Sequence, residues 1–214
     1  MKLVFASNNR HKLEEVRQIM PAEVEVLSLR DVGFVSEIDE TGETLEANSR
    51  IKVEAVCDFF RTQMSAVSPQ IDGVFADDTG LEIDALDGKP GVYTARWYSL
   101  DAPSVPLQEQ EIFAANRAKA LRELAGKANR GAQFRTVITL ASGPGMEKVI
   151  QVEGVVRGRI ATEEHGEGGF GYDPIFIPEG YDKTFAELPA EVKNSISHRA
   201  RALANLAQIL QKQK

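Results

Sequence analysis

Apolar runs of strand length alternate with segments of helical periodicity along most of the chain. Short apolar or alternating runs predict strands, and apolar residues that recur every third or fourth position predict helices. Strands are predicted at residues 2–6, 24–29, 73–77 and 81–86, and helices at residues 13–20 and 44–64. A proline follows the first helical pattern and ends it, because proline cannot continue a helix.

The second half of the chain differs because it contains a long β-rich stretch. A helix is predicted at residues 107–125, and residues 133–160 have the pattern of a hairpin with long arms. A short strand is expected at 174–177, and Ser195 or Ser197 is expected to start a C-terminal helix. The interleaving predicts an α/β fold with a mixed sheet, because the hairpin is antiparallel.

The composition is that of a globular protein, with 43% hydrophobic and 27% charged residues. Residues 1–214 are predicted to form one domain with two lobes that share the sheet. The formal charge of −7 argues against a nucleic-acid polymer or an anionic membrane as the main partner, because both bind basic surfaces. A small phosphorylated ligand remains compatible, since it needs only a local cluster of lysines, a helix end or a metal ion.

The cysteine content and the length of the apolar runs bear on the cellular compartment and on possible metal sites. The single cysteine, Cys57, excludes an intramolecular disulfide and a cysteine-based zinc site, and its apolar neighbours predict a buried thiol. The first apolar run is too short for a signal peptide, and no window approaches the roughly 18 apolar residues of a membrane span. We therefore expect a soluble, cytoplasmic protein.

The stretch "FADDTGLEID" (residues 75–84) places two adjacent aspartates, Asp77 and Asp78, at the end of an apolar run. Such like charges near a sheet must be solvated, hydrogen-bonded or neutralised by a cation. The pair is therefore either an exposed acidic turn or a cation site. If both residues have extended backbone, their side chains point to opposite faces of the sheet.

Two polar stretches in the first quarter of the chain are candidates for phosphate or substrate binding. "ASNNRHK" (residues 6–12) lies at a predicted strand-to-helix junction, where backbone N–H groups bind phosphate; the alternative is a surface turn that caps a helix. In "DETGETLEANSRIK" (residues 39–52), Thr44, Asn48 and Lys52 share one helix face. This face either lines a cleft or is simply solvated.

Two further stretches stand near the C-terminus. "GEGGFGYDP" (residues 166–174) contains G-x-G-x-x-G, but a strand rather than a helix follows it, so a dinucleotide-binding loop is not predicted. Its glycines indicate a backbone bent around a ligand, with Phe170 or Tyr172 as a wall for a flat ring, or else a flexible turn. In "KNSISHRARAL" (residues 193–203), Arg199 falls in a first helical turn, where a cation needs a ligand or a carboxylate to offset the helix dipole.

Taken together and in this order, the motifs are similar to those of the inosine triphosphate pyrophosphatase family. The resemblance rests on "ASNNRHK", "ETGETLEANSRIK", "ADDTGL", "GKPGVYTARW", "GGFGYDPIF" and "SHR", and it spans the chain from residue 1 to about 210. Two departures are mild, because Thr79 and Thr94 keep the hydroxyl of the serine that the family often has at these positions. The resemblance implies a two-lobed fold, an elongated mixed sheet with helices on its sides and a substrate cleft, a homodimer and a Mg²⁺ requirement.

The family reaction converts a nucleoside triphosphate and water to the monophosphate and pyrophosphate, which removes inosine and xanthosine triphosphates (ITP, dITP, XTP) from the nucleotide pool. By motif match, Asp78 falls on the proton acceptor and metal ligand, with Glu40 as a second metal contact. Asp77 is predicted as a further metal contact, which reaches the ion through water or else ties up the loop. The phosphate side would comprise Ser7, Asn8, Asn9, Arg10, His11, Lys12, Lys52 and Thr79, of which Asn8 lies at a variable position. The nucleotide and base side would comprise Phe170, Gly171, Tyr172, Asp173, Lys193, His198 and Arg199.

The physical chemistry agrees with this reading. A triphosphate brings about four negative charges to an acidic protein, so carboxylates that recruit Mg²⁺ are needed. Inosine and xanthosine carry an oxygen at purine position 6, which donors such as Arg199, His198 or backbone N–H groups can recognise. Two rivals remain, a pyrophosphatase of modified pyrimidine nucleotides and a non-catalytic nucleotide sensor. The base-side motifs count against the first, and the complete acidic set counts against the second.

Overall fold

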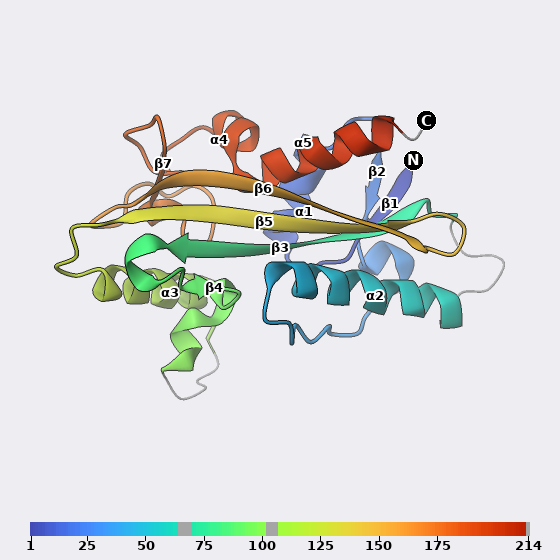
Figure 1. Ribbon diagram of the computed structural model, residues 1–214, viewed down its shortest axis with the longest axis horizontal. Helices are drawn as coiled ribbons and strands as arrows, with labels where there is room; N and C mark the ends of the chain where they lie inside the picture. Colours follow the sequence, from blue (N-terminus) through green and yellow to red (C-terminus); the bar gives the residue numbers. More distant parts are fainter. Residues whose placement is uncertain (64–69, 102–106, 213–214) are drawn as a thin grey trace. The chain divides into compact units, whose positions relative to one another are not determined.

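The computed structural model describes residues 1–63, 70–101 and 107–212. Its strands form a sheet in the order β2-β1-β3-β5-β6-β7, and β4 pairs with β3 (Figure 1). The strands are β1 (Lys2–Phe5), β2 (Glu25–Leu27), β3 (Gly73–Ile83), β4 (Pro90–Gly91), β5 (Gly131–Ser142), β6 (Lys148–Ile160) and β7 (Phe176–Pro178). β1 runs parallel to β2 and β3, whereas β4 is antiparallel to β3 and β7 to β6. The predicted mixed sheet is therefore confirmed.

The described residues also form five α-helices and four short 3₁₀ helices. The α-helices are α1 (Arg10–Ile19), α2 (Leu45–Gln63), α3 (Glu109–Glu123), α4 (Ala190–Ile196) and α5 (His198–Gln211). The 3₁₀ helices are η1 (Arg30–Val32), η2 (Asp84–Leu86), η3 (Thr94–Leu100) and η4 (Asp173–Ile175). Within the described residues, no helix is both long and apolar enough to cross a membrane.

Chain contacts divide the protein into two compact units, which we describe separately. The first unit comprises Met1–Asp78, Thr136–Gly154 and Arg199–Lys214, and the second comprises Thr79–Arg135 and Val155–His198. Strands β3, β5 and β6 each contribute residues to both units. The assignment of the whole chain to a single domain stays a prediction.

In the first unit, strand alternation sends neighbouring side chains into two separate cores. Leu3, Phe5 and Phe75 pack with side chains of α1 and α5, whereas Val4 and Val74 pack with side chains of α2. Figure 1 shows α5 on one side of these strands and α2 on the other. Each face of the sheet is therefore covered, which explains why these strands read as continuous apolar runs.

Cys57 belongs to α2 and lies in the core, as its apolar neighbours predict. Its side chain is buried, and burial raises the pKa of its thiol to about 11. The thiol is therefore protonated at neutral pH and acts as a small apolar group in the core.

The structure corrects two predicted boundaries. The strands predicted at 73–77 and 81–86 are one strand, β3, which continues through both aspartates before η2 begins. The acidic pair does not interrupt the strand, because cationic side chains meet it inside the fold. At the C-terminus, Ser195 lies inside the separate helix α4, and α5 begins directly after Ser197, so only the second of the two predicted starts is right.

The second unit has its own core around the ends of the long strands. It joins Leu81 of β3, Leu124 beside α3, Phe134 of β5 and Phe176 of β7. The rings of Phe134 and Phe176 have centroids 4.7 Å apart, a normal spacing for packed aromatic rings. The predicted hairpin is present as β5 and β6, and η4 replaces the first half of the strand predicted at 174–177.

Gly158 provides a test of the packing of β6 against β7. It is paired with Pro178, and a methyl group on its Cα would overlap the carbonyl oxygen of Ile177 and the ring of Phe176. We expect Gly158→Ala to lower the free energy of unfolding by about 1–3 kcal/mol, as overpacking does. Urea denaturation followed by circular dichroism measures this change.

Gly145 supplies the matched control, because a methyl group there would meet only the flexible carboxylate of Glu147, at 3.1 Å. Gly145→Ala should leave the midpoint almost unchanged. Equal midpoints for Gly158→Ala and the wild type would contradict the close approach of β7.

Candidate functional site

The loop that follows β1 forms the predicted strand-to-helix junction. The Ser7 hydroxyl accepts the Asn9 N–H at 3.2 Å, and the Asn9 side chain caps α1 by accepting the Lys12 N–H at 2.9 Å. Arg10 is exposed and pairs with Glu14 at 3.1 Å. Ser7 and Asn9 thus shape the turn, as capping residues do.

The remaining members of this stretch differ in exposure. Asn8 is exposed and His11 is half-buried. The Lys12 side chain leaves the turn and points toward β3, where its ammonium nitrogen lies 3.1 Å from an Asp77 oxygen. The stretch thus contributes one mostly buried cation to the acidic pair.

Asp77 is fully occupied by cations on one face of β3. One of its oxygens binds Lys12, and the other accepts the Arg199 Nε–H at 3.0 Å. Arg199 also forms an ion pair with Glu15 of α1. Burial alone would raise the pKa of Asp77, but Lys12 and Arg199 outweigh it and hold the pKa well below its usual range. Asp77 is therefore an ionised residue whose carboxylate holds Lys12 and Arg199 in place.

Asp78 faces the opposite side of β3, as strand geometry predicts, and meets α2. The Lys52 ammonium lies 3.4 Å from Asp78 Oδ1 and 3.1 Å from Glu40 Oε1. Burial raises the pKa of Asp78, and the nearby carboxylates of Glu40 and Asp77 add to this effect. Burial lowers the pKa of Lys52, but the carboxylates of Asp78, Glu40 and Asp77 outweigh it and raise this pKa. The cluster of Asp78, Glu40 and Lys52 thus contains two carboxylates and one ammonium group.

This group fits a divalent cation. Asp78 Oδ2 is buried and has no hydrogen-bond partner among the described residues, and the Glu40 side chain is one-third exposed. Within the described part of the chain, no three acidic, histidine or cysteine side chains are arranged to hold a metal by themselves. Mg²⁺ fits such a site, because it commonly uses one or two carboxylates and completes its shell with water and phosphate oxygens.

The polar stripe predicted on α2 has three different roles. The Thr44 hydroxyl caps the helix by accepting the Ala47 N–H at 3.1 Å. The Asn48 side-chain oxygen accepts the Gly42 N–H at 2.7 Å, and Gly42 is so close to Ala47 and Asn48 that it has no room for a Cβ. These contacts fix the acidic segment that carries Glu40 against the start of α2, while Lys52 reaches the carboxylates.

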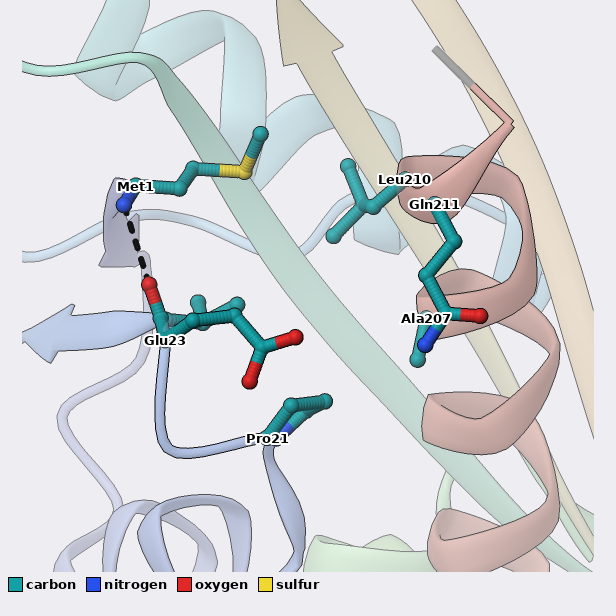
Figure 2. Close-up of a pocket in the computed structure, with 7 residues that line it drawn as sticks. Met1, Pro21, Glu23, Ala207, Leu210 and Gln211 are labelled. Atoms are coloured by element: carbon teal, nitrogen blue, oxygen red, sulfur yellow. Dashed lines mark hydrogen bonds between the residues drawn. The ribbon is translucent and has the colours of Figure 1, made fainter. Parts of the chain in front are cut away.

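A small cavity also lies in the first unit, near the chain ends (Figure 2). Its volume is about 20 Å³, and its lining includes Met1, Pro21 and Leu210. The Met1 ammonium beside it donates to the Glu23 carbonyl at 3.0 Å (Figure 2). None of the predicted site residues lines this cavity, and it holds little more than one water molecule, so it is not the substrate site.

In the second unit, the glycine-rich motif forms a tight loop before η4. Gly169 and Gly171 have φ values of 70° and 64°, which favour glycine. One oxygen of Asp173 accepts the Phe170 N–H at 2.8 Å and binds the Lys193 ammonium at 2.7 Å. Asp173 and Lys193 are both buried, so the pair fixes the loop from inside.

The structure decides between the two aromatic candidates of this loop. Tyr172 is buried in the core of the second unit, and its hydroxyl donates to the Thr94 carbonyl at 3.0 Å. Burial raises the pKa of this hydroxyl. Phe170 is half-buried, with the Lys193 ammonium 5.0 Å from its ring centroid. Phe170 is therefore the better candidate for an aromatic wall.

The remaining predicted residues lie in different surroundings. His198 is buried and stacks on Phe134, with ring centroids 4.7 Å apart. Arg199 follows it directly but turns its guanidinium to Asp77 and Glu15, so the cation in the first turn of α5 does have carboxylate partners. Thr79, half-buried, is the first residue of the second unit.

Glu15 is a site residue that the sequence analysis missed. It contacts Arg199 across 184 positions of the chain, and no local pattern indicates this contact. Sequence periodicity cannot identify Glu15 as a site residue, because its contact with Arg199 depends on how α1 and α5 pack on the same face of β3.

Asp77→Asn tests the structural role of Asp77. We expect the free energy of unfolding at neutral pH to fall by about 3–5 kcal/mol, because breaking a buried ion pair leaves charges without compensation. The folded-state pKa of Asp77 lies below the ordinary value of about 3.9, so its contribution is complete above that value and is lost as the pH falls further. The difference between wild type and variant should therefore shrink in acid, which urea denaturation at several pH values measures.

Asp58→Asn is the control for this prediction. Asp58 belongs to the same unit but is exposed, and its ion pair with Arg61 lies on the surface of α2. Removing it should cost no more than about 1 kcal/mol. A difference between wild type and Asp77→Asn that stays constant as the pH falls well below the ordinary pKa of about 3.9 would contradict the assigned ionisation of Asp77.

Comparison with known proteins places these features in a family. The sequence model of the Ham1 family matches residues 3–209. The dITP/XTP pyrophosphatase of Flavobacterium johnsoniae is 43% identical over 98% of both chains, and that of Bacillus subtilis is 45% identical over 97% of this chain and 96% of its own.

Solved structures agree. The Staphylococcus aureus Ham1 protein superposes with a TM-score of 0.79 at 36% identity, covering all of both chains. A nucleoside-triphosphatase / dITP/XTP pyrophosphatase from Mycobacterium abscessus gives a TM-score of 0.69 at 38% identity, covering 96% of this chain and 98% of its own. These matches confirm the resemblance predicted from the motifs: the chain belongs to the Ham1 family.

Proposed function

We propose that this protein hydrolyses non-standard purine nucleoside triphosphates, namely ITP, dITP and XTP, to the monophosphate and pyrophosphate. Relatives that cover nearly the whole chain are named dITP/XTP pyrophosphatases. The observation that carries the proposal is the buried Asp78 carboxylate, which keeps one oxygen without a hydrogen-bond partner among the described residues beside Lys52 and Glu40. A buried carboxylate oxygen without a hydrogen-bond partner destabilises the fold, so its presence in a native structure indicates a functional role.

We assign the phosphate contacts to the residues around β1 and α2. Backbone N–H groups at the start of α1 favour an anion, as helix N-termini generally do. Lys52 would shift from sharing Asp78 and Glu40 to binding phosphate oxygens once a divalent cation neutralises those carboxylates. Thr79 would add a hydroxyl. The remaining members of this proposed set are Ser7, Asn8, Asn9, Arg10, His11 and Lys12.

Mg²⁺ is the cation that we propose for Asp78 and Glu40, where it would neutralise phosphate charge and favour attack by water. Asp78 is also the proposed proton acceptor. Its second oxygen has no hydrogen-bond partner among the described residues and is available to accept a proton from water. Asp77 was predicted as a further metal contact, but both of its oxygens are ion-paired, so we assign it the task of orienting Lys12 and Arg199.

We assign base recognition to the loop of the second unit. Phe170 would stack on the purine, and the Asp173–Lys193 pair with the backbone of Gly171 and Tyr172 would hold the loop in shape. His198 and backbone N–H groups are the proposed donors to the oxygen at purine position 6. A site built on such a hydrogen bond can reject adenine by about 10⁴-fold or more. Arg199 is a less direct candidate, because Asp77 and Glu15 already bind its guanidinium.

A homodimer in the cytoplasm completes the proposal. The family resemblance is its support. Light scattering on the purified protein should give a mass twice the 23.5 kDa of one chain. A mass of one chain at working concentrations would remove the dimer from the proposal without affecting the reaction.

Steady-state hydrolysis of ITP, dITP, XTP, GTP and ATP, with pyrophosphate and orthophosphate assayed separately, tests the function. We expect pyrophosphate from the first three, dependence on Mg²⁺, and a loss of at least about 10²-fold in kcat for Asp78→Asn, the usual contribution of a general base. Asp58→Asn should behave as the wild type. Nucleotide binding without turnover would favour a sensor, and preference for modified pyrimidine triphosphates would favour that rival enzyme.

The pH dependence of kcat/KM tests the role of Asp78 separately. Because the pKa of Asp78 is raised, its protonated form persists above the ordinary range, and activity that needs the carboxylate should be lost as the pH falls through this raised value. Higher Mg²⁺ concentration favours the carboxylate and should move this acid limb to lower pH. An acid limb that does not respond to Mg²⁺ would contradict the proposal that Asp78 is both the metal ligand and the proton acceptor.

A further inference from the structure

Arg117 of α3 lies beside the base-recognition loop but has no place in the mechanism above. Its Nη1 donates to the Gly171 carbonyl at 2.9 Å, and its Nε lies 3.0 Å from an oxygen of Glu164. The Arg117 side chain is 14% exposed, so most of it is fixed by its surroundings. One guanidinium thus joins α3 to two points of the segment that carries the glycine-rich motif.

The same face of α3 makes a second contact with this loop. Phe113 precedes Arg117 by one helical turn, so the two side chains lie on one face. The Phe113 ring centroid is 6.2 Å from that of Phe170. Two neighbouring loop residues, Phe170 and Gly171, are therefore held by one apolar and one charged contact from α3.

The loop needs such contacts, because its glycines are conformationally free. Gly169 and Gly171 both have positive φ, and glycine loses more backbone entropy on ordering than any other residue. Loops of this kind keep one conformation only when neighbouring elements fix them. Asp173 supplies one fixed point through the Phe170 N–H, and Arg117 supplies another on the other side of that residue.

A third set of contacts connects both α3 and the loop to η3. Asn116 of α3 accepts the Tyr98 N–H at 2.8 Å and donates to the Ala95 carbonyl at 3.0 Å. The Tyr172 hydroxyl binds the carbonyl of Thr94, where η3 begins. Helix α3 therefore holds both the loop and the segment to which the loop is anchored.

We propose that Arg117 is a positioning residue for base selection, which holds the loop through Gly171 so that Phe170 meets the purine. This inference rests on the proposed function. Misplacement of a binding group by about 1 Å can cost 10²-fold in rate, so loss of this contact should affect the fit of the base. Arg117 belongs to the second unit and Asp78 to the first, so the hydrolytic step should be affected less.

Arg117→Met tests the proposal, because methionine keeps most of the length but cannot donate. We expect the ratio of kcat/KM for ITP over ATP to fall by about 10-fold or more, mainly through a higher KM for ITP, with kcat changed by less than about 3-fold. Arg117→Lys, which can still donate to the Gly171 carbonyl, should recover part of the ratio. A general loss of stability would instead lower the activity on every nucleotide equally.

Arg122→Met is the matched control, since Arg122 lies on the same helix, carries the same charge and is exposed. It should keep the wild-type ratio to within about 2-fold, as surface substitutions usually do. Hydrogen exchange of residues 169–173 without nucleotide gives a second readout. Exchange there should become faster in Arg117→Met and stay unchanged in Arg122→Met.

The outcomes separate this inference from the proposed function. If the wild type selects ITP and Arg117→Met keeps both the ratio and the slow exchange, the inference is overturned and the function stands. If the wild type hydrolyses none of the nucleotides, the function fails, and the exchange measurement alone decides whether Arg117 positions the loop. Should Arg117→Met not fold, Phe113→Leu must reproduce the lower ratio and the faster exchange, and a wild-type result would overturn the inference.

Discussion

Two adjacent carboxylates inside one buried strand are the constraint on which the rest of the structure depends. Neighbouring residues of β3 face opposite sides of the sheet, and Asp77 and Asp78 form ion pairs with different cations. Each must be compensated separately, and the chain does this with cations from helices on opposite faces. Arg199 and Lys12 serve Asp77, whereas Lys52 serves Asp78.

The two carboxylates are compensated to different degrees on the two faces of β3, and this difference distinguishes a structural aspartate from a functional one. Asp77 has both oxygens bound by cations, and its pKa is lowered. Asp78 shares one cation with Glu40, keeps an oxygen without a hydrogen-bond partner among the described residues, and has a raised pKa. A fully compensated carboxylate stabilises the fold, and an under-compensated one can accept a metal ion or a proton. We infer that Asp77 is the carboxylate that stabilises the fold and that Asp78 is the one that can accept a metal ion or a proton.

Local patterns predict the elements well but miss the long-range contacts. Periodicity identifies the helices and the hairpin, and motif order identifies the family. The break expected between the strands at 73–77 and 81–86 is wrong, because Arg199, 122 positions away, accommodates Asp77 inside a continuous strand. The burial of Tyr172 and the Glu15–Arg199 pair are likewise missed, since both depend on packing between distant elements.

Binding of Mn²⁺, a paramagnetic substitute for Mg²⁺, tests the division between the two aspartates most directly. Electron paramagnetic resonance titration would follow free Mn²⁺ with wild type, Asp77→Asn and Asp78→Asn, each in the presence of imidodiphosphate as a phosphate mimic. The account predicts that Asp78→Asn remains folded and loses the bound metal, whereas folded Asp77→Asn retains it. Metal binding that survives in Asp78→Asn and is lost in folded Asp77→Asn would contradict the account.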